Sequence, residues 1–363
     1  MLKHFTNILI LLVVMILSSC VQDPSSPTVN SQSFGKGSGV MVLCEGLWGM
    51  NNSSLTIFSM DSDLVINDYY QQANAGRKLG DLASDLVVVG DTAFISSSSA
   101  DKIIVMRISD GKHIADIPAA DGDFPRKLCI SNSELGFWTN LKSNSITAFN
   151  PTTFEIIRSN IKTGPAPEAI AVSSKYIFVA NSGYGDFLAD EPDAGTIGVY
   201  DINSFEKVKT IAGMPNVMEL EYLSETDKLY ACYYHLPSAK DSLGGIVEID
   251  GTDLKILQEK RIDGTTMSIN NKLEQVLFTN INGVFSFDLN NFNSHVNRRV
   301  QPINFGDIYY SMAVNETEDL LFLANARQYT TNGQIEVYNY FSTDEPIRII
   351  DCGLNPNKIV IIN

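Results

Sequence analysis

Short stretches that alternate between apolar and polar or small residues recur along most of the chain. Three follow one another closely, PEAIAV (167–172), YIFVAN (176–181) and TIGVYD (196–201). They are rich in β-branched and aromatic residues and are bounded by Gly, Pro, Asn or Asp, which is typical of β-strands. Their period of two excludes a repeat of isolated helices.

Each of these three elements appears seven times. The first type recurs at 80–85 (a weaker copy), 125–130, 216–221, 265–270, 309–314 and 356–361; the second at 41–46, 93–98, 136–141, 229–234, 276–281 and 321–326; the third at 54–59, 102–107, 145–150, 245–250, 283–288 and 334–339. A weaker fourth strand follows most third strands, as in VKTI (208–211) and IRII (347–350). Residues 40–363 divided by seven give about 46 residues per unit, which suits a four-stranded propeller blade.

The order of the copies predicts how the ring closes. The chain enters at a second-type strand, 41–45, and ends on a first-type strand, 357–362. Pairing of the last strand into the first blade would leave no open sheet edge. We therefore predict an all-β fold, a single seven-bladed β-propeller of four-stranded blades over residues 40–363.

The N-terminus predicts a lipoprotein. Residues 1–19 contain Lys3, an apolar run too short to span a bilayer, and Leu17-Ser18-Ser19 before Cys20, which resembles a lipobox cleaved before a lipidated cysteine. An ordinary secretory signal is the alternative. Residues 20–39 are predicted to form a flexible tether. We expect an outer-membrane lipoprotein on the cell surface or the periplasmic face, without a membrane-spanning segment.

The charge balance excludes one class of partner. The chain has 26 basic and 42 acidic residues, and loss of residues 1–19 removes one lysine and no acid, which leaves 25 basic residues and a net charge of −17. This charge repels phosphate backbones, so we expect no binding to nucleic acid. It favours a neutral or cationic ligand, and we expect a monomer.

The register of the repeats places the cysteines. Cys44 and Cys232 align with small residues of the second strands, and Cys129 aligns with small residues of the first strands, so buried thiols are expected. Cys352 lies just before the closing strand, where it could approach Cys44. One disulfide in an oxidising compartment is therefore an open alternative.

Long loops should gather on one face of the propeller. Fourth-to-first and second-to-third connections share a face, and the second-to-third connections at 46–53, 182–195, 233–245 and 326–333 are long. We expect these loops to bring Trp48, Asn51, Asn52, Tyr184, Phe187, Tyr233, Tyr234, His235, Arg327 and Tyr329 to a ligand-binding rim. Roughly half of the aromatic side chains should pack beneath their own loops.

A second set of candidates comes from the residues that open the first strands. We expect Asp81, Arg126, Glu168, Asn216, Thr265, Tyr310 and Asn357 to surround the mouth of the central channel. Two residues deeper, Ala83, Leu128, Ile170, Met218, Met267, Met312 and Ile359 are predicted to form an apolar plug. The mouth would then be polar, and its varied charges would suit one asymmetric ligand.

Residues for catalysis are scarce. The chain has four histidines, of which only His235 is expected on the long-loop face, and no nucleophile-elbow motif is present. Asp186, Asp190, Glu191 and Asp193 could hold calcium, but their spacing favours a solvated acidic loop. We therefore expect no catalytic residues, no metal site and no cofactor.

The repeats resemble the YVTN/YncE-like family of bacterial propellers over residues 40–363, with IFVAN (177–181) and IGVYD (197–201) as matching elements. CEGLWGMNNSSLTIF (44–58) is similar to the opening of propeller lipoproteins of Bacteroidetes-type bacteria. The matching residues are Glu45, Gly46, Trp48, Gly49, Asn51, Asn52 and Leu55, whereas Cys44 and Leu47 depart from the pattern. The BtuG type within that group captures cobalamin and passes it to a TonB-dependent transporter.

The leading functional hypothesis is a lipid-anchored, non-enzymatic protein that captures an extracellular nutrient or glycan. The resemblance implies, as its sharpest version, a corrinoid handed to a TonB-dependent outer-membrane transporter. A platform for protein interaction or adhesion is the alternative, and it predicts a broad aromatic patch without a deep pocket. A propeller lyase is a third alternative, and it predicts His235 paired with a carboxylate and a metal.

Overall fold

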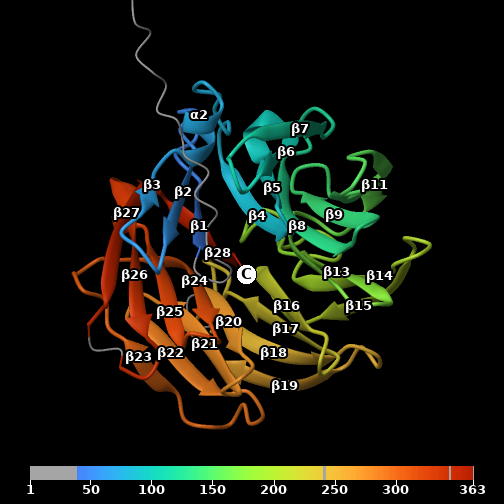
Figure 1. The fold of residues 1–363 in the computed structure, drawn as a ribbon. Coiled ribbons are helices and arrows are strands. Elements are labelled where there is room, and N and C mark those ends of the chain that lie inside the picture. The colour runs from blue at the N-terminus through green and yellow to red at the C-terminus, as the bar shows by residue number, and fades with distance from the viewer. Residues whose placement is uncertain (1–38, 240–242, 343–344, 363) are drawn as a thin grey trace, which may run out of the picture. The chain divides into compact units, whose positions relative to one another are not determined.

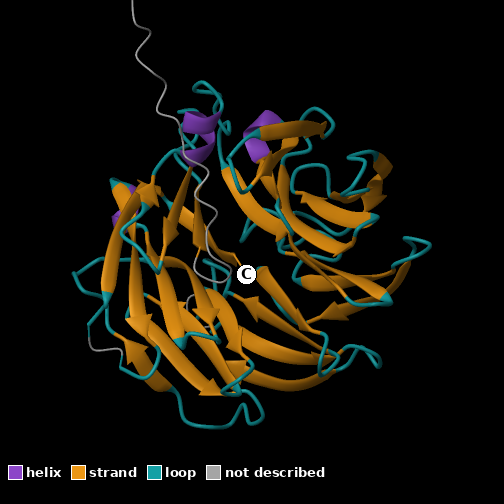
Figure 2. Ribbon diagram, viewed as in Figure 1, coloured by secondary structure: helices purple, strands orange, loops and turns teal. Residues whose placement is uncertain are grey.

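The computed structural model describes residues 39–239, 243–342 and 345–362. In this part of the chain, seven four-stranded antiparallel sheets surround a central axis (Figure 1). Almost all of the regular structure is strand (Figure 2). The predicted seven-bladed β-propeller is confirmed, and each sheet is one blade.

Each blade orders its four strands from the central axis outward. Blade 1 contains β28 (Pro356–Ile362), β1 (Gly39–Cys44), β2 (Ser54–Ser59) and β3 (Val65–Ile66). Blade 2 contains β4 (Ala83–Val89), β5 (Thr92–Ser97), β6 (Lys102–Arg107) and β7 (His113–Pro118). Blade 3 contains β8 (Pro125–Asn132), β9 (Leu135–Asn140), β10 (Ser145–Phe149) and β11 (Ile156–Lys162).

The remaining blades follow the same order. Blade 4 contains β12 (Pro167–Val172), β13 (Tyr176–Asn181), β14 (Thr196–Asp201) and β15 (Lys207–Ala212). Blade 5 contains β16 (Val217–Leu223), β17 (Lys228–Tyr233), β18 (Gly245–Asp250) and β19 (Ile256–Arg261). Blade 6 contains β20 (Thr266–Asn270), β21 (Gln275–Asn280), β22 (Gly283–Asp288) and β23 (Asn297–Val300). Blade 7 contains β24 (Tyr309–Asn315), β25 (Leu320–Asn325), β26 (Asn332–Asn339) and β27 (Arg348–Leu354).

The ring closes as predicted. The C-terminal strand β28 pairs antiparallel with β1, with Met41 opposite Val360 and Val42 opposite Ile359. This pairing joins the two ends of the propeller chain within one sheet, so the first blade gains its innermost strand from the last residues. A closed ring of this kind protects the edge of β1 from pairing with another chain.

The core lies between the blades. The middle strands of a blade are buried on both faces because each sheet packs against a neighbour on either side. For example, Phe178 and Val199 of blade 4 pack in one cluster with Leu229 and Val247 of blade 5. The outer strands are mostly exposed, as in β11. This gradient explains why the second and third strands were the clearest signals in the sequence.

Helical structure is limited to short segments in the described part of the chain. The five-residue helix α2 (Tyr69–Ala73) follows β3, and the 3₁₀ turns η1 (Ser98–Ala100) and η2 (Arg327–Tyr329) follow second strands. Tyr69 and Tyr70 of α2 are buried, and the Tyr69 hydroxyl donates to the Ile108 carbonyl at 2.8 Å. A helix this short has too few turns to leave a periodic pattern in the sequence, and it was not predicted.

Cys44 and Cys352 are neighbouring buried thiols. They belong to one apolar cluster, and the neighbouring Cys44 and burial both raise the pKa of the Cys352 thiol. The structure has both as free cysteines, as it has Cys129 and Cys232. The predicted proximity of Cys44 and Cys352 is therefore present, without a covalent bond.

The predicted signal peptide, the lipidation site Cys20 and the tether up to residue 38 lie outside the described residues. The propeller begins at Gly39, the first residue of β1. No helix in the described ranges is long and apolar enough to cross a membrane.

Candidate functional site at the mouth of the central channel

A β-bulge at the start of the innermost strands directs side chains into the channel. In β12, Pro167 pairs with Asn181 but Ala169 pairs with Ala180, so Glu168 is an extra residue. Bulges of this type re-aim a side chain and are frequent near functional sites. The same insertion occurs in six blades, at Ser84, Arg126, Glu168, Met218, Tyr310 and Asn357.

All six bulge residues line one cavity of about 260 Å³ at the mouth of the channel. The complete lining is Ser84, Arg126, Lys127, Glu168, Met218, Glu219, Tyr234, Thr265, Ile308, Tyr309, Tyr310, Tyr329 and Asn357. The predicted mouth residues Arg126, Glu168, Thr265, Tyr310 and Asn357 are therefore brought together. The cavity is mainly polar and aromatic, which is the composition expected of a site that orients a small ligand.

Arg126 is the centre of a hydrogen-bonded network in this cavity. Its Nη2 and Nε atoms donate to Glu168 Oε1 at 2.6 and 2.9 Å, and its Nη1 lies 3.3 Å from Glu45 Oε1. The Tyr310 hydroxyl donates to Glu45 Oε2 at 3.0 Å. Burial opposes the charge on Arg126, but Glu168 and Glu45 outweigh it and raise the pKa of the guanidinium. Two carboxylates around one arginine leave the network with a net negative charge.

Three of the four tyrosines that line the mouth cavity are Tyr234, Tyr310 and Tyr329. Tyr310 and Tyr329 meet edge to face with ring centroids 5.3 Å apart, and the Tyr234 hydroxyl donates to the Thr265 carbonyl. Burial raises the pKa of Tyr234 and of Tyr310, and nearby carboxylates raise both further. These hydroxyls therefore remain protonated at physiological pH and are available as hydrogen-bond donors or acceptors.

Aromatic side chains also stand on the surrounding loops. Trp48 is 64% exposed and stacks on Phe124 at 5.7 Å, and the Lys142 ammonium lies 4.3 Å from the Phe124 ring centroid. Tyr184 and Phe187 form a second pair at 5.5 Å. Phe187 is 83% exposed. These rings offer flat apolar surface with little loss of side-chain entropy on binding.

Three predicted site residues, Asp81, Asn52 and Asn216, hold the loops instead of lining the cavity, and Asn51 lies in one of the loops that they hold. Asp81 accepts hydrogen bonds from the amides of Gly49 (2.6 Å) and Asn51 (3.3 Å). The Asn52 carboxamide accepts from the Leu47 amide, and Asn216 accepts from the Gly185 amide. Asp81 and Asn216 were expected to open first strands, but they lie two residues before β4 and one residue before β16. β4 begins at Ala83, not at residue 80, and the bulge residues of β4 and β16 are Ser84 and Met218.

Three further residues that were predicted on the rim, Tyr233, His235 and Arg327, do not line the mouth cavity. Tyr233 does not reach the surface, because it is fully buried and its hydroxyl is bound to Glu259 and Arg261. His235 is partly exposed on the loop after β17, and its Nδ1 lies 3.7 Å from Asp263 Oδ1. Arg327 hydrogen-bonds to Gln334, outside the mouth cavity.

Exposed apolar side chains are distributed unequally between the two faces of the described propeller. The loops of the mouth face carry Trp48, Met50, Tyr184, Phe187, Leu243, Ile281, Ile303, Phe305 and Tyr329. The turns of the opposite face carry Phe341, Ile347 and, at the end of β4, Val89. A concentration of exposed apolar groups is typical of an interaction surface, which makes the mouth face the candidate for one.

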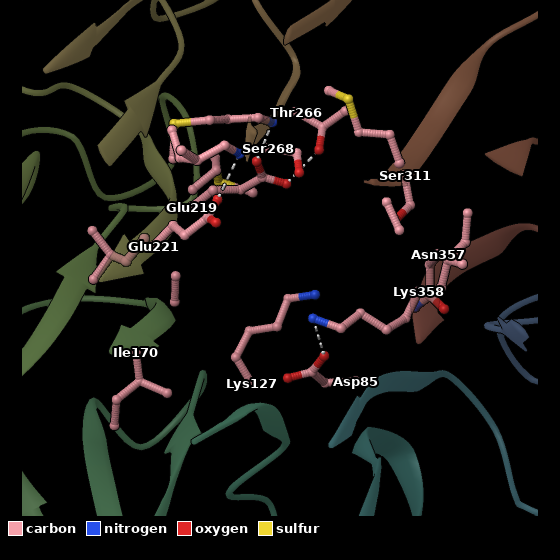
Figure 3. Close-up of a pocket in the computed structure, with 18 of the residues that line it drawn as sticks. Asp85, Lys127, Ile170, Glu219, Glu221, Thr266, Ser268, Ser311, Asn357 and Lys358 are labelled. Atoms are coloured by element: carbon pink, nitrogen blue, oxygen red, sulfur yellow. Dashed lines mark hydrogen bonds and ion pairs between the residues drawn. The ribbon is translucent and has the colours of Figure 1, made fainter. Parts of the chain in front are cut away.

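A second cavity of about 400 Å³ lies deeper in the channel (Figure 3). Six of the seven predicted plug residues, all except Ala83, line it, but charged side chains share the lining. Lys127 and Lys358 point into the space from one side, and Glu219 and Glu221 lie on the other (Figure 3). The prediction of a purely apolar plug was therefore wrong. The β-bulge at the start of an innermost strand shifts the alternation by one residue, so the polar residue that follows the bulge also points into the channel.

Three carboxylates in the channel accept hydrogen bonds from backbone amides at the edges of neighbouring innermost strands. Asp85 accepts from the Leu128 amide at 2.9 Å, Glu219 from Met267 at 2.6 Å and Glu221 from Ile269 at 3.2 Å. These amides face the channel and have no further strand to pair with. Structural stabilisation is thus one role of each carboxylate.

The ionisation of these groups differs. Burial opposes the charge on Asp85, but Lys358, Lys127 and backbone amides outweigh it and lower the pKa of Asp85. Burial raises the pKa of Glu219, and it raises the pKa of Glu221 to about 8, with Glu219 adding to that rise. At neutral pH the channel is therefore less negative than its residue types suggest.

Among the described residues, no group of three or more His, Cys, Asp or Glu side chains could hold a metal ion. Two acidic side chains of the loop after β13 have other partners. The Asp186 carboxylate accepts a hydrogen bond from the Ser238 hydroxyl, and Asp193 Oδ2 lies 2.8 Å from Lys207 Nζ. The arrangement favours the solvated acidic loop over a calcium site.

Comparison with known proteins gives the family. Residues 38–220 match the family described as "Domain of unknown function (DUF5074)", which is half of the chain. The chain belongs to the DUF5074 family. No curated protein matches the sequence.

Two solved structures are similar to this DUF5074 protein. A quinonprotein alcohol dehydrogenase-like protein from Bacteroides thetaiotaomicron has a TM-score of 0.69 at 14% identity, with 90% of this chain and 79% of that chain covered. Hydrazine synthase from Kuenenia stuttgartiensis has a TM-score of 0.61 at 15% identity, with 74% of this chain and 85% of that chain covered. Identities this low show the fold alone.

The sequence interpretation of the DUF5074 propeller missed several site residues. Glu45 was read only as part of a sequence resemblance, and Ser84, Lys127, Glu219 and Lys358 were not recognised as channel residues. One signal was present in the sequence. Adjacent polar residues such as Arg126-Lys127 and Asn357-Lys358 interrupt strands that otherwise alternate, which is a mark of a bulge.

Proposed function

We propose that this protein is a non-enzymatic binding protein that captures an extracellular ligand at the mouth of its central channel. The observation that carries the proposal is the position of a polar cavity of about 260 Å³ on the same face as the exposed aromatic side chains. The cavity supplies directional hydrogen bonds, and the rim supplies apolar contact area. Lys127 also lines the cavity and offsets the negative balance of the Arg126 network, which favours a neutral ligand with hydrogen-bonding groups.

In its sharpest form, the protein is anchored through Cys20 to the outer membrane and delivers a corrinoid or similar nutrient to a TonB-dependent transporter. A corrinoid is larger than the mouth cavity. Only one edge of it, such as an amide-bearing side chain, would enter beside Arg126 and Tyr310. Its broad face would then lie on the rim, where Trp48 and Tyr184 are exposed. A glycan would use the same rings for its sugar faces.

A protein-interaction platform is the second candidate function. The nine exposed apolar side chains on the mouth-face loops favour it, because such residues are the usual anchors of protein interfaces. The mouth cavity favours a small ligand instead. The two candidates differ in whether affinity depends on cavity residues or on the outer loops alone.

The test is a calorimetric titration of residues 20–363, carrying Cys20→Ser to prevent lipidation, with cyanocobalamin and then with neutral oligosaccharides. We expect saturable binding that weakens by about tenfold or more in Trp48→Ala and Tyr184→Ala, since buried aromatic contacts carry much of such affinity. Phe341→Ala is the matched control, because Phe341 is 65% exposed on the opposite face. Absence of heat with every ligand would overturn small-molecule capture, and equal losses in the control would remove the mouth face as the site.

A further inference from the structure

The deeper cavity separates opposite charges across an open space. Lys127 and Lys358, from β8 and β28, extend toward each other from one wall (Figure 3). Glu219 and Glu221, both from β16, lie on the opposite wall (Figure 3). No ion pair joins these lysines to these glutamates within the described residues, although opposite charges this deep in a channel attract strongly. The cavity that these four side chains help to line has a volume of about 400 Å³.

The lysines retain unused hydrogen-bonding capacity. Lys127 Nζ donates to the Ser84 carbonyl at 3.2 Å, and Lys358 Nζ lies 3.4 Å from Asp85 Oδ1. An ammonium group has three donors. Each lysine therefore has donors left for an anion placed between the two, and the two ammonium groups together would match the two oxygens of a carboxylate.

The opposite wall offers acceptors. Glu221 Oε2 accepts from the Ile269 amide, and the other Glu221 oxygen has no partner among the described residues. Glu219 uses its two oxygens for Thr266 Oγ1 (2.8 Å) and the Met267 amide (2.6 Å). Each carboxylate oxygen has more than one lone pair. A cationic group of the ligand can therefore bind between Glu219 and Glu221 without displacing the strand contacts.

Between the charged walls, the lining is apolar or weakly polar. Ile170, Met267, Met312 and Ile359 contribute aliphatic and thioether surface. A ligand that joins a carboxylate to an ammonium group across a short apolar body matches all three parts of the lining. The cavity is within the range of volumes that hold small organic ligands.

We propose that this deeper cavity is a binding site for a small zwitterion whose charged ends are separated by a short chain, an ω-amino acid or a dipeptide, with its carboxylate on Lys127 and Lys358 and its ammonium group on Glu219 and Glu221. This site is separate from the capture of a ligand at the mouth and does not depend on it. Lys127, Met218, Glu219 and Asn357 line both cavities, so the two cavities adjoin.

The experiment is calorimetric titration of residues 20–363, carrying Cys20→Ser, at pH 8 with 5-aminopentanoate and L-alanyl-L-alanine, followed by their N-acetylated and C-amidated forms. We expect saturable binding of a free zwitterion, and a loss of about tenfold or more when either end is blocked, because each block removes one charged contact. Equal binding of a blocked form, or no binding of either free zwitterion, would overturn the proposal.

Variants locate the site. Lys127→Met and Glu221→Gln should each weaken binding by about tenfold. Glu221→Gln keeps an oxygen that can accept from the Ile269 amide, so this variant is expected to fold even if Lys127→Met does not. Phe341→Ala, on the opposite face, is the matched control and should leave zwitterion affinity unchanged. Full affinity in Glu221→Gln would exclude the cavity as the site, whatever the rim variants show for ligands at the mouth.

Discussion

The Nη2 atom of Arg126 lies 2.6 Å from Oε1 of Glu168, although the two residues come from the innermost strands of different blades. Both are bulge residues, so the same local irregularity in two strands turns the two side chains toward each other. Glu45, from blade 1, completes the network at 3.3 Å. The mouth of the channel is thus held by a charge network that spans three blades.

Replacement of Arg126 by methionine should destabilise the protein strongly. Glu168 is 3% exposed and would lose its main partner, and breaking a buried ion pair from one side typically costs about 3–5 kcal/mol. Urea denaturation measures the free energy of unfolding. Arg158→Met is the control, because Arg158 and Glu206 are 4.0 Å apart at the surface, where a pair contributes about 1 kcal/mol or less. A smaller loss for Arg126 than for Arg158 would contradict a structural role of the network.

Asp81→Ala should loosen the rim loop that carries Trp48. The carboxylate of Asp81 accepts hydrogen bonds from the amides of Gly49 and Asn51 and so ties this loop to the start of blade 2. Hydrogen exchange at both amides should accelerate by about tenfold, since a charge-assisted bond of about 1.5 kcal/mol or more is removed. Affinity for the mouth ligand should fall as well, because the Trp48 platform is less ordered.

Asp91→Ala is the matched control for that change. Asp91 holds the amide and hydroxyl of Ser109 at 2.8 and 2.7 Å on the opposite face. We expect faster exchange at Ser109 and unchanged ligand affinity. If exchange at Gly49 stays the same in Asp81→Ala, the loop does not depend on this carboxylate.

Glu221→Gln should stabilise the protein increasingly as pH rises from 5 to 9. The folded-state pKa of Glu221 is raised from 4.5 to about 8, so between these values the native state keeps a proton that the unfolded chain has released. The free energy of unfolding of the unmodified protein therefore decreases as pH increases through this window. Glutamine does not titrate and removes this loss.

The gain is bounded by about 1.4 kcal/mol for each unit of pKa shift, and water in the cavity should keep it well below that bound. Denaturation midpoints at pH 5, 7 and 9 measure it, with Glu134→Gln, at an exposed turn, as the control. A constant difference between Glu221→Gln and the unmodified protein across this range would show that Glu221 is already ionised in the native state.

Mild oxidation should join Cys44 to Cys352. The two thiols are neighbours in one buried cluster, on β1 and β27, so we expect that little backbone movement is needed. A bond between the first and last blades would restrict the unfolded chain and add roughly 2–4 kcal/mol. Peptide mapping identifies the bond, and urea midpoints measure its effect. Cys129→Ser should behave like the unmodified protein, whereas Cys44→Ser should lose both effects; a mixed or absent crosslink would contradict the arrangement.

The fold could be predicted from the sequence because every blade repeats the same alternation of apolar and polar residues. YIFVAN (176–181) matches β13 residue for residue, and TIGVYD (196–201) matches β14. These middle strands pack between two neighbouring blades, so they consist mainly of apolar and small residues, which makes them recognisable in the sequence. The copy at 80–85 was displaced, because β4 begins at Ala83 and the residues before it form a loop that supports Trp48.

The site was predictable only in part. Arg126, Glu168 and Tyr310 were expected at the mouth and line it, whereas Tyr233 was expected on the rim and is buried against Glu259. The direction of a side chain at the end of a strand depends on whether a bulge precedes it. A single inserted residue reverses that direction. The alternation of apolar and polar residues within one strand does not show where the inserted residue lies relative to the partner strand.

The sequence by itself determined the number of blades, the order of their strands and the closure of the ring by residues 356–362, because hydrophobic alternation is a local property repeated seven times. Only the tertiary structure decided which charges meet. Glu45, Arg126 and Glu168 lie in different blades, and Lys358 of the C-terminal strand β28 forms an ion pair with Asp85 of blade 2. Such contacts depend on the bulges and on the angles between blades, which arise when all seven sheets pack together.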